Sequence, residues 1–155
     1  MVFFQPRHLR AFLAVVHGGS VAHAGEEISR VQSAITHAVR GLETDLGVQL
    51  FERHARGMQP TEFGRMLQTH AETIFAELDA ARGAMQRLAG GARLNANAPI
   101  FTLSIGKQRL LVFVELMKAG HMGAVAREFG ISQSAVSQAL REVERGVGQT
   151  LARRS

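Results

Sequence analysis

The sequence contains no cysteine, no tryptophan and no tyrosine, and only three of its 155 residues are proline. Without cysteine the chain forms no disulfide and offers no thiolate ligand to a metal, which fits a reducing cytoplasm. Its seven histidines lack the short spacing of a metal-binding pair. No apolar run approaches the roughly 18 residues that cross a membrane. The sequence therefore predicts a cytoplasmic protein without a membrane segment, a metal or a cofactor.

The motifs of catalysis are also missing. Gly106 and Lys107 could end a phosphate-binding loop, but Phe101 stands where that loop needs its first glycine. Residues 130–134 place a serine two positions after a glycine but lack the second glycine of a nucleophile elbow. No pair of carboxylates is placed for acid–base chemistry. An enzyme is therefore not expected.

What the sequence has instead is a helical composition and an uneven charge. Hydrophobic residues make up 46% of the chain and aromatic residues only 6%, and strong helix formers are common. Residues 1–91 hold nine arginines and nine acidic residues, whereas residues 92–155 hold nine lysines and arginines against four glutamates. The net charge of +5 therefore lies in the second part, as a surface facing nucleic acid requires. Charge alone also fits a basic domain with another role.

The sequence contains an internal repeat. A shift of 101 positions lays residues 8–54 on residues 109–155 without a gap. Identical pairs include Phe12 and Phe113, Gln32 and Gln133, Arg40 and Arg141, and Gly47 and Gly148. A gapless match of this length indicates one supersecondary unit used twice.

Each copy has the pattern of three helices. The apolar residues of the first helix follow the spacing of one buried face, at Leu9, Phe12, Leu13 and Val16 and again at Leu110, Phe113, Val114 and Met117. Glycine ends this helix in both copies. A short second helix, a tight turn and a third helix with an apolar stripe follow. This order predicts a helix-turn-helix.

The third helix of each copy places polar side chains opposite its apolar stripe. They are Gln32, Ser33, Thr36, His37 and Arg40 in the first copy and Gln133, Ser134, Ser137, Gln138 and Arg141 in the second. An amide can bond adenine through two hydrogen bonds, a hydroxyl can bond a base edge or a phosphate, and arginine can hold phosphate or guanine. One such face also fits a solvated helix. The same set at the same offset in both copies favours DNA recognition.

The arrangement resembles the N-terminal DNA-binding domain of LysR-type transcriptional regulators over residues 7–90 and 107–155. In the first copy the resemblance rests on the turn at Gly19 and Ser20, on Gln32 and residues 34–36, on residues 42–43, 46–47 and 50–53, and on residues 56–57 and 61–64. In the second copy it rests on residues 130–137 and 143–144, and on Gly148 and Leu151. It implies a winged helix-turn-helix in a bacterial DNA-binding protein.

The resemblance implies roles for individual residues. These roles are base reading by Gln32, Thr36, Gln133 and Ser137, backbone contacts by Arg40 and Arg141, and wing contacts by Arg53 and Arg56, with the second copy matching as far as Arg154. His37 and Gln138 stand where the family often has arginine, so the resemblance does not decide whether these two residues contact a base. Val31 stands where the second copy has Ser132, so the third helix of the first copy is expected to lack a side-chain cap.

A long helix is predicted between the two copies. Residues 61–88 contain no proline, and their apolar residues follow alternating steps of four and three, at Leu67, Ala71, Ile74, Leu78, Ala81, Met85 and Leu88. This heptad seam predicts a dimerising coiled coil, which the LysR resemblance also implies. Spacing alone also fits a helix packed on its own domain. Within the linker that follows, residues 100–105 alternate like a short strand.

The predicted organisation is mainly α, with two winged helix-turn-helix modules joined by a coiled-coil linker helix. The first module is expected at 1–60, the dimerisation helix at 61–91, a linker at 92–106 and the second module at 107–155, where the sequence stops before a second wing. A small-molecule effector is expected only with a further domain. The predicted function is sequence-specific binding of double-stranded DNA by a homodimer in transcription regulation. The alternative is a protein-interaction module that modulates another regulator without binding DNA.

Overall fold

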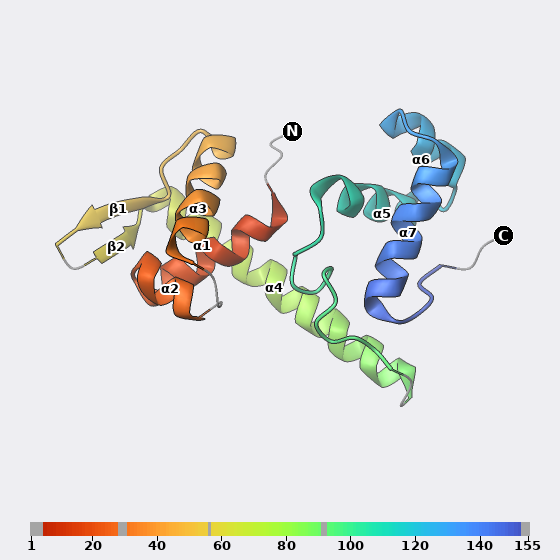
Figure 1. Ribbon diagram of the computed structural model, residues 1–155, viewed down its shortest axis with the longest axis horizontal. Helices are drawn as coiled ribbons and strands as arrows, with labels where there is room; N and C mark the ends of the chain where they lie inside the picture. The colour runs from red at the N-terminus through yellow and green to blue at the C-terminus, as the bar shows by residue number, and fades with distance from the viewer. Residues whose placement is uncertain (1–4, 28–30, 56, 91–92, 153–155) are drawn as a thin grey trace. The chain divides into compact units, whose positions relative to one another are not determined.

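A computed structural model describes residues 5–27, 31–55, 57–90 and 93–152, which form two compact units, Met1–Glu77 and Leu78–Ser155 (Figure 1). The first unit contains, in order, α1 (Pro6–Gly18), α2 (Val21–Glu27), α3 (Gln32–Leu46), β1 (Phe51–His54), β2 (Gly57–Pro60) and the first part of α4 (Glu62–Ala89). The second unit contains the last part of α4, then α5 (Lys107–Ala119), α6 (Met122–Phe129) and α7 (Gln133–Val147).

The internal repeat of the sequence is also a repeat of structure. Helices α5 and α7 begin and end 101 positions after α1 and α3, and α6 begins 101 positions after α2. Helices α1 and α5 each end in a left-handed glycine, Gly19 or Gly120, at φ 65°. Side chains other than glycine rarely adopt this conformation, so glycine sets the turn into the second helix. The predicted three-helix pattern is confirmed in both units.

In the first unit α1 lies at the centre of the core and contacts α2, α3 and β2. Phe12 is fully buried, and its ring centroid lies 5.3 Å from that of Phe51, with the rings tilted by 49°. This aromatic pair joins α1 to the β-hairpin, in which Phe51 pairs with Pro60 and His54 with Gly57 in antiparallel register. The hairpin confirms the predicted wing of the first copy.

The second unit has two apolar clusters. The first joins the three helices through Val112, Leu116, Val125, Ala126, Val136 and Leu140. The second joins α7 to the segment before α5 through Ala98, Phe101, Ile105, Val143 and Val147. The segment is held further by hydrogen bonds from Asn95 Nδ2 to the Gly146 carbonyl and from Gln149 Nε2 to the Arg93 carbonyl.

The strand predicted at 100–105 is wrong. Residues 99–103 form turns, and Leu103 takes a left-handed conformation at φ 52°. An alternating pattern is typical of a strand with one buried and one exposed face. Phe101, Leu103 and Ile105 are indeed buried, but turns rather than an extended backbone bring them onto the core. The predicted linker is therefore packed along most of its described length.

Helix α4 has the predicted length and position. Its 28 residues rise roughly 42 Å. Thr61 precedes it: its hydroxyl accepts a hydrogen bond from the Gly64 amide at 3.0 Å and donates one to the Gln49 carbonyl at 2.8 Å. Gly64 is buried where the helix passes the Leu50 carbonyl, so the hairpin and the helix meet without space for a side chain.

The heptad residues of α4 have different surroundings. Ala71 is fully buried within this chain, and Met85 packs against the second cluster of the second unit. These two positions therefore pack against the chain's own cores, and the dimer seam as a whole stays a prediction. Leu67 and Leu78 are half-buried, whereas Ile74, Ala81 and Leu88 are exposed. Two exposed residues that the seam did not include, Phe63 and Met66, extend the outward apolar stripe.

Helices α3 and α7 begin differently, as expected. Ser132 precedes α7, and its hydroxyl accepts a hydrogen bond from the Ala135 amide at 3.1 Å. Val31 precedes α3 and provides no such acceptor. The backbone angles are similar, φ −67° and ψ 143° at Val31 against φ −76° and ψ 154° at Ser132. A serine at position 31 therefore fits the existing backbone.

Replacing Val31 by serine should stabilise the start of α3 by about 1 kcal/mol, because the hydroxyl would satisfy a free backbone amide. The valine side chain is 71% exposed, so its loss removes little packing. Hydrogen exchange of the α3 amides in the full chain should slow by about fivefold. The reciprocal change Ser132→Val should speed exchange in α7, and unchanged rates in both variants would contradict a capping role.

Candidate nucleic-acid interface

The outer face of α3 carries the predicted recognition residues. Gln32, Ser33, His37 and Arg40 are exposed and Thr36 is half-buried. On the opposite side Ile35, Val39 and Leu42 are buried in the core. The buried apolar side of the helix therefore leaves amide, hydroxyl and guanidinium groups facing outward. These polar residues lie on one face of α3, as the sequence predicts.

A groove of about 640 Å³ runs between α3 and the β-hairpin. Thr36 and Arg40 line it from the helix, and Arg53 lines it from β1. Three predicted contact residues from two different elements thus border one hollow. Arg56 and Arg154, which were also predicted to contact DNA, lie outside the described residues.

The outer face of α7 repeats that of α3 with more internal contacts. Gln133, Ser134, Gln138 and Arg141 are exposed and Ser137 is half-buried. Arg141 Nη1 donates to the Ser137 hydroxyl at 2.9 Å, and Gln138 Nε2 donates to Glu142 Oε1 at 3.2 Å. The Ser134 hydroxyl lies 2.7 Å from that of Ser132, the cap residue. The predicted groups of the second unit are therefore present, and several of them are preorganised.

The repeated glutamate near the end of α3 and of α7 has a structural role that the sequence did not reveal. Glu43 Oε1 accepts a hydrogen bond from the Leu50 amide at 2.8 Å. Glu144 Oε1 accepts one from the Leu151 amide at 2.9 Å and one from Ala152 at 3.3 Å. These carboxylates fix the chain as it leaves the recognition helix. The sequence signal for this role was that both copies have glutamate at the same repeat position.

The contact between the first and third helices uses different chemistry in each unit. In the first unit His8 is buried over Gly41, and a β-carbon on that glycine would lie 3.0 Å from the ring. Burial, and then the neighbouring charge of Arg7, lower the pKa of His8, which favours the neutral ring. In the second unit the same two repeat positions hold Arg109 and Glu142, which form an ion pair.

An exposed hydrogen bond joins α1 to α4. His17 Nε2 lies 3.1 Å from Glu72 Oε1, and Gln68 Nε2 donates to the same oxygen at 2.8 Å. The hydrogen bonds from Gln68 and His17 lower the pKa of Glu72. The contact lies one residue from the buried Ala71, where the first part of α4 packs against the rest of the first unit.

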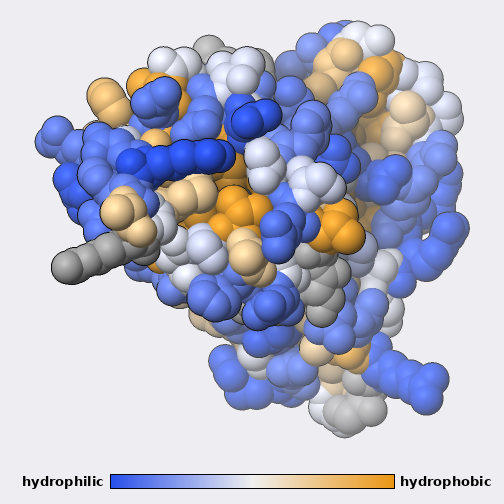
Figure 2. Space-filling view, turned by 60° about the vertical axis from the view of Figure 1, so that its left-hand side comes forward, coloured by the Kyte–Doolittle hydropathy of each residue, from blue (hydrophilic) through white to orange (hydrophobic). Residues whose placement is uncertain are grey.

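Figure 2 shows hydrophilic residues over most of the face that it presents, with hydrophobic residues visible in separate patches. Among the described residues, no helix is long and apolar enough to cross a membrane. Within the same part of the chain, no group of three histidine or acidic side chains is gathered as metal ligands.

Comparison with known proteins gives the family. The sequence pattern of the bacterial regulatory helix-turn-helix proteins of the lysR family matches residues 6–65 and 108–155. The transcriptional regulator GalR of Pseudomonas putida is 43% identical over 143 residues, which cover 92% of this chain and 34% of GalR. The regulator GltR of Bacillus subtilis is 36% identical over 77 residues, or 50% of this chain and 26% of GltR. The chain thus spans about a third or less of the length of these relatives.

Solved structures agree with this result. The BenM DNA-binding domain in its complex with catB site 1 DNA superposes with a TM-score of 0.54 at 31% identity, covering 57% of this chain and 99% of that one. The LysR-family regulator CbnR superposes with a TM-score of 0.50 at 36% identity, covering 56% of this chain and 29% of CbnR. The fold is that of a LysR-type winged helix-turn-helix domain. From sequence pattern and structure together, the chain belongs to the LysR family of bacterial DNA-binding transcriptional regulators.

Proposed function

We infer that this chain binds a specific DNA sequence through both of its units, with α3 and α7 each entering a major groove. The observation that carries this inference is the repeated polar face: the same amide, hydroxyl and guanidinium groups stand outward on both helices at an offset of 101 residues. The match to the family pattern in two separate ranges supports two modules. The alignment with GalR supports them too, because 143 residues exceed either unit.

The geometry suggests separate roles along each helix. Gln32 and Gln133 lie in the first turn, where a recognition helix meets base edges, and an amide there can bond adenine. Arg40 and Arg141 lie about two turns later, and arginine at that distance reaches the phosphate backbone. Arg53 on the wing adds a cation across the groove from Arg40. Base reading therefore belongs to the glutamines and positioning to the arginines.

The outward stripe of α4 supports a homodimer. Phe63, Met66, Ile74 and Leu88 are exposed apolar residues on this helix. Phe63, Ile74, Ala81 and Leu88 fall within a narrow arc when each residue advances about 100° around the axis. An exposed apolar line of this length fits pairing with the same helix of a second copy. A two-fold dimer would place equivalent recognition helices on two half-sites.

Separate substitutions on α7 test the two roles. Gln133→Ala should weaken binding to the preferred sequence by about 1–3 kcal/mol and relax selection at one base position. Arg141→Ala should weaken specific and random DNA alike and reduce the salt dependence of binding by about one phosphate contact. Both would be measured by fluorescence anisotropy on the full chain over a salt series. Equal losses on specific and random DNA for Gln133→Ala would contradict base reading by this residue.

The competing function is a dimerisation partner that does not touch DNA. The charge balance of residues 1–91, with nine arginines and nine acidic residues, favours it for this part of the chain. The salt series separates the two functions, because counterion release makes DNA affinity fall steeply with salt. A chain that shows no DNA binding at low salt and yet forms stable complexes with another LysR-type protein would establish the competing function.

A further inference from the structure

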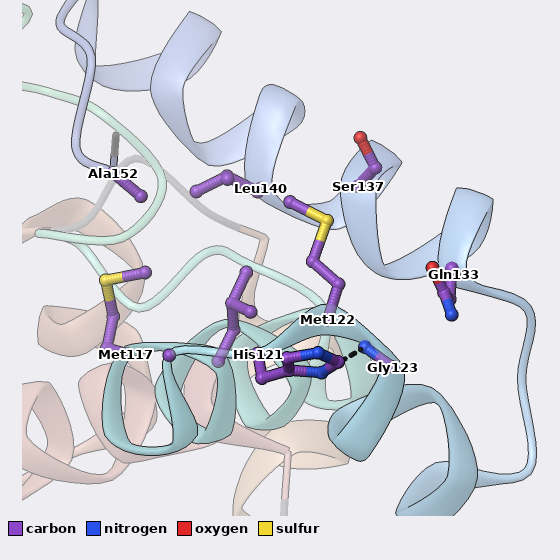
Figure 3. A pocket seen from close by; sticks show the side chains of 10 residues that line it. Met117, His121, Met122, Gly123, Gln133, Ser137, Leu140 and Ala152 are labelled. Atoms are coloured by element: carbon purple, nitrogen blue, oxygen red, sulfur yellow. Dashed lines mark hydrogen bonds between the residues drawn. The ribbon is translucent and has the colours of Figure 1, made fainter. Parts of the chain in front are cut away.

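The start of α6 packs against the recognition residue Gln133. Gly123 is buried in the first turn of α6, and a β-carbon placed on it would lie 3.0 Å from the Gln133 Nε2 atom. A contact of 3.0 Å is shorter than nine in ten real β-carbon contacts. The side-chain amide therefore lies in space that glycine leaves open. Figure 3 shows Gln133 at the start of α7 and Gly123 on the neighbouring turn of α6.

His121 forms the other border of this space. Its Nδ1 atom accepts a hydrogen bond from the Gly123 amide at 3.1 Å (Figure 3) and one from the Ala124 amide at 3.3 Å, which caps α6. These bonds require Nδ1 without a hydrogen and so hold the ring in one orientation. The same β-carbon on Gly123 would also lie 3.0 Å from the ring carbon Cε1. The imidazole and the Gln133 amide thus both touch the position of the missing side chain.

The first unit has a different arrangement at the equivalent positions. Ser20 stands where the second unit has His121, and its hydroxyl accepts a hydrogen bond from the His23 amide at 3.2 Å. Ala22 stands where the second unit has Gly123, so a methyl group is present there. The recognition glutamine, Gln32, is the same residue type as Gln133. The two glutamines therefore start from identical helix positions, while the residues at these two nearby repeat positions differ between the units.

We propose that Gly123 and His121 are positioning residues that hold the Gln133 amide against α6 and give the second unit a base preference different from that of the first. The proposal rests on the proposed function, in which Gln133 contacts a base. A two-point bond between an amide and a base needs both amide atoms at about 2.7–3.2 Å and aligned with the base edge. A small change in the resting orientation of the amide therefore changes which base it meets best.

The contact itself is tested on the free full-length chain by NMR. The side-chain amide protons of Gln133 should show a nuclear Overhauser effect to the α-protons of Gly123. In Gly123→Ala the Gln133 side-chain amide signals should shift, because the methyl group displaces them. Absence of the Overhauser effect in the unmodified chain overturns the proposal whatever the DNA result.

The consequence is tested by base selection from randomised DNA. Gly123→Ala should change discrimination at one base position by at least about fivefold, the lower end of what a two-point amide contact contributes, with binding to random DNA kept within about twofold. His121→Ser keeps a capping hydroxyl, as Ser20 does, and should change the same position to a smaller extent. The matched control is Gly146→Ala in α7, where a β-carbon makes an ordinary 3.4 Å contact with Pro99, and it should leave base selection unchanged.

The outcomes for the two proposals are distinguishable. If Gln133→Ala changes base selection and Gly123→Ala does not, base reading holds and the positioning role is overturned. If neither changes base selection while the chain still selects a sequence, Gln133 does not read a base and that part of the proposed function fails. A shift at one base position in both variants, together with the Overhauser effect, supports the positioning role.

Discussion

Replacing Ile74 by aspartate is expected to convert a dimer of this chain into a monomer. Ile74 is 39% exposed in the isolated chain and lies in the middle of the outward stripe of α4, between Phe63 and Leu88. In a paired helix this position would be covered, and a buried unpaired carboxylate is strongly unfavourable. Because linking two modules raises binding to a two-part site by about 10²–10⁴, affinity for such a site should fall by a similar factor.

Sedimentation velocity at roughly tens of micromolar, where dimer formation depends on protomer concentration, gives the direct measurement. The matched control is Ala76→Asp, which places the same charge at an exposed position nearly opposite Ile74 on the helix. The control should remain dimeric. An unmodified chain that sediments as a monomer under these conditions would show that the stripe serves another purpose.

The helical part of the fold could be predicted from the sequence because local patterns determine it. The spacing from Leu9 to Val16 and the glycines that follow locate α1, and the repeat carries the same boundaries to α5. The burial of each helix could not be read from the same pattern. Leu13 is 7% exposed, whereas its repeat partner Val114 is 38% exposed. In the first unit β2 contacts α1, whereas in the second unit the segment before α5 packs against Leu110 and Phe113.

The heptad pattern of α4 illustrates a second limit. Spacing alone cannot tell whether an apolar residue faces a second chain or the chain's own core, because both need the same helical period. Ala71 turns inward, and the exposed line passes instead through Ile74 and the unpredicted Phe63. Tertiary contacts, and not periodicity, decide between these two outcomes. The strand predicted at residues 100–105 was wrong for a related reason, because alternation does not distinguish a strand from buried turns.

The site shows a third limit. Residue types and their repetition were enough to place the polar groups on one helix face, and the structure confirms that placement. The orientation of Gln133 depends on Gly123 and His121, which precede it in the chain and carry no DNA-binding signal of their own. The same holds for Glu43, whose carboxylate fixes the turn after α3. Contacts between helices set these orientations, so they follow from the fold and not from the recognition helix alone.

Gly64→Ala should destabilise the first unit by about 3 kcal/mol or more. Gly64 is buried in the first turn of α4, and a β-carbon there would overlap the Leu50 carbonyl oxygen and approach the Pro60 Cβ atom to 3.1 Å. Both neighbours are backbone or ring atoms, so relief requires moving the hairpin away from the helix. Overpacking of this kind costs about 1–3 kcal/mol when side chains can adjust and more when the backbone must move. The wing would shift with it, which should also weaken DNA binding.

Gly83→Ala in the same helix should have the opposite effect and provides the matched control. A β-carbon on Gly83 meets only the end of the Arg87 side chain, at 3.5 Å, which is an ordinary contact with a movable group. Alanine in a helix interior is more favourable than glycine by about 0.5–1 kcal/mol, so this variant should be stabilised. In urea unfolding followed by circular dichroism, the midpoint of Gly64→Ala should be lower than that of the unmodified chain, and the midpoint of Gly83→Ala should be higher. A loss of stability in both variants would mean that α4 tolerates no added side chain at either position, and the close approach at Leu50 would not be the cause.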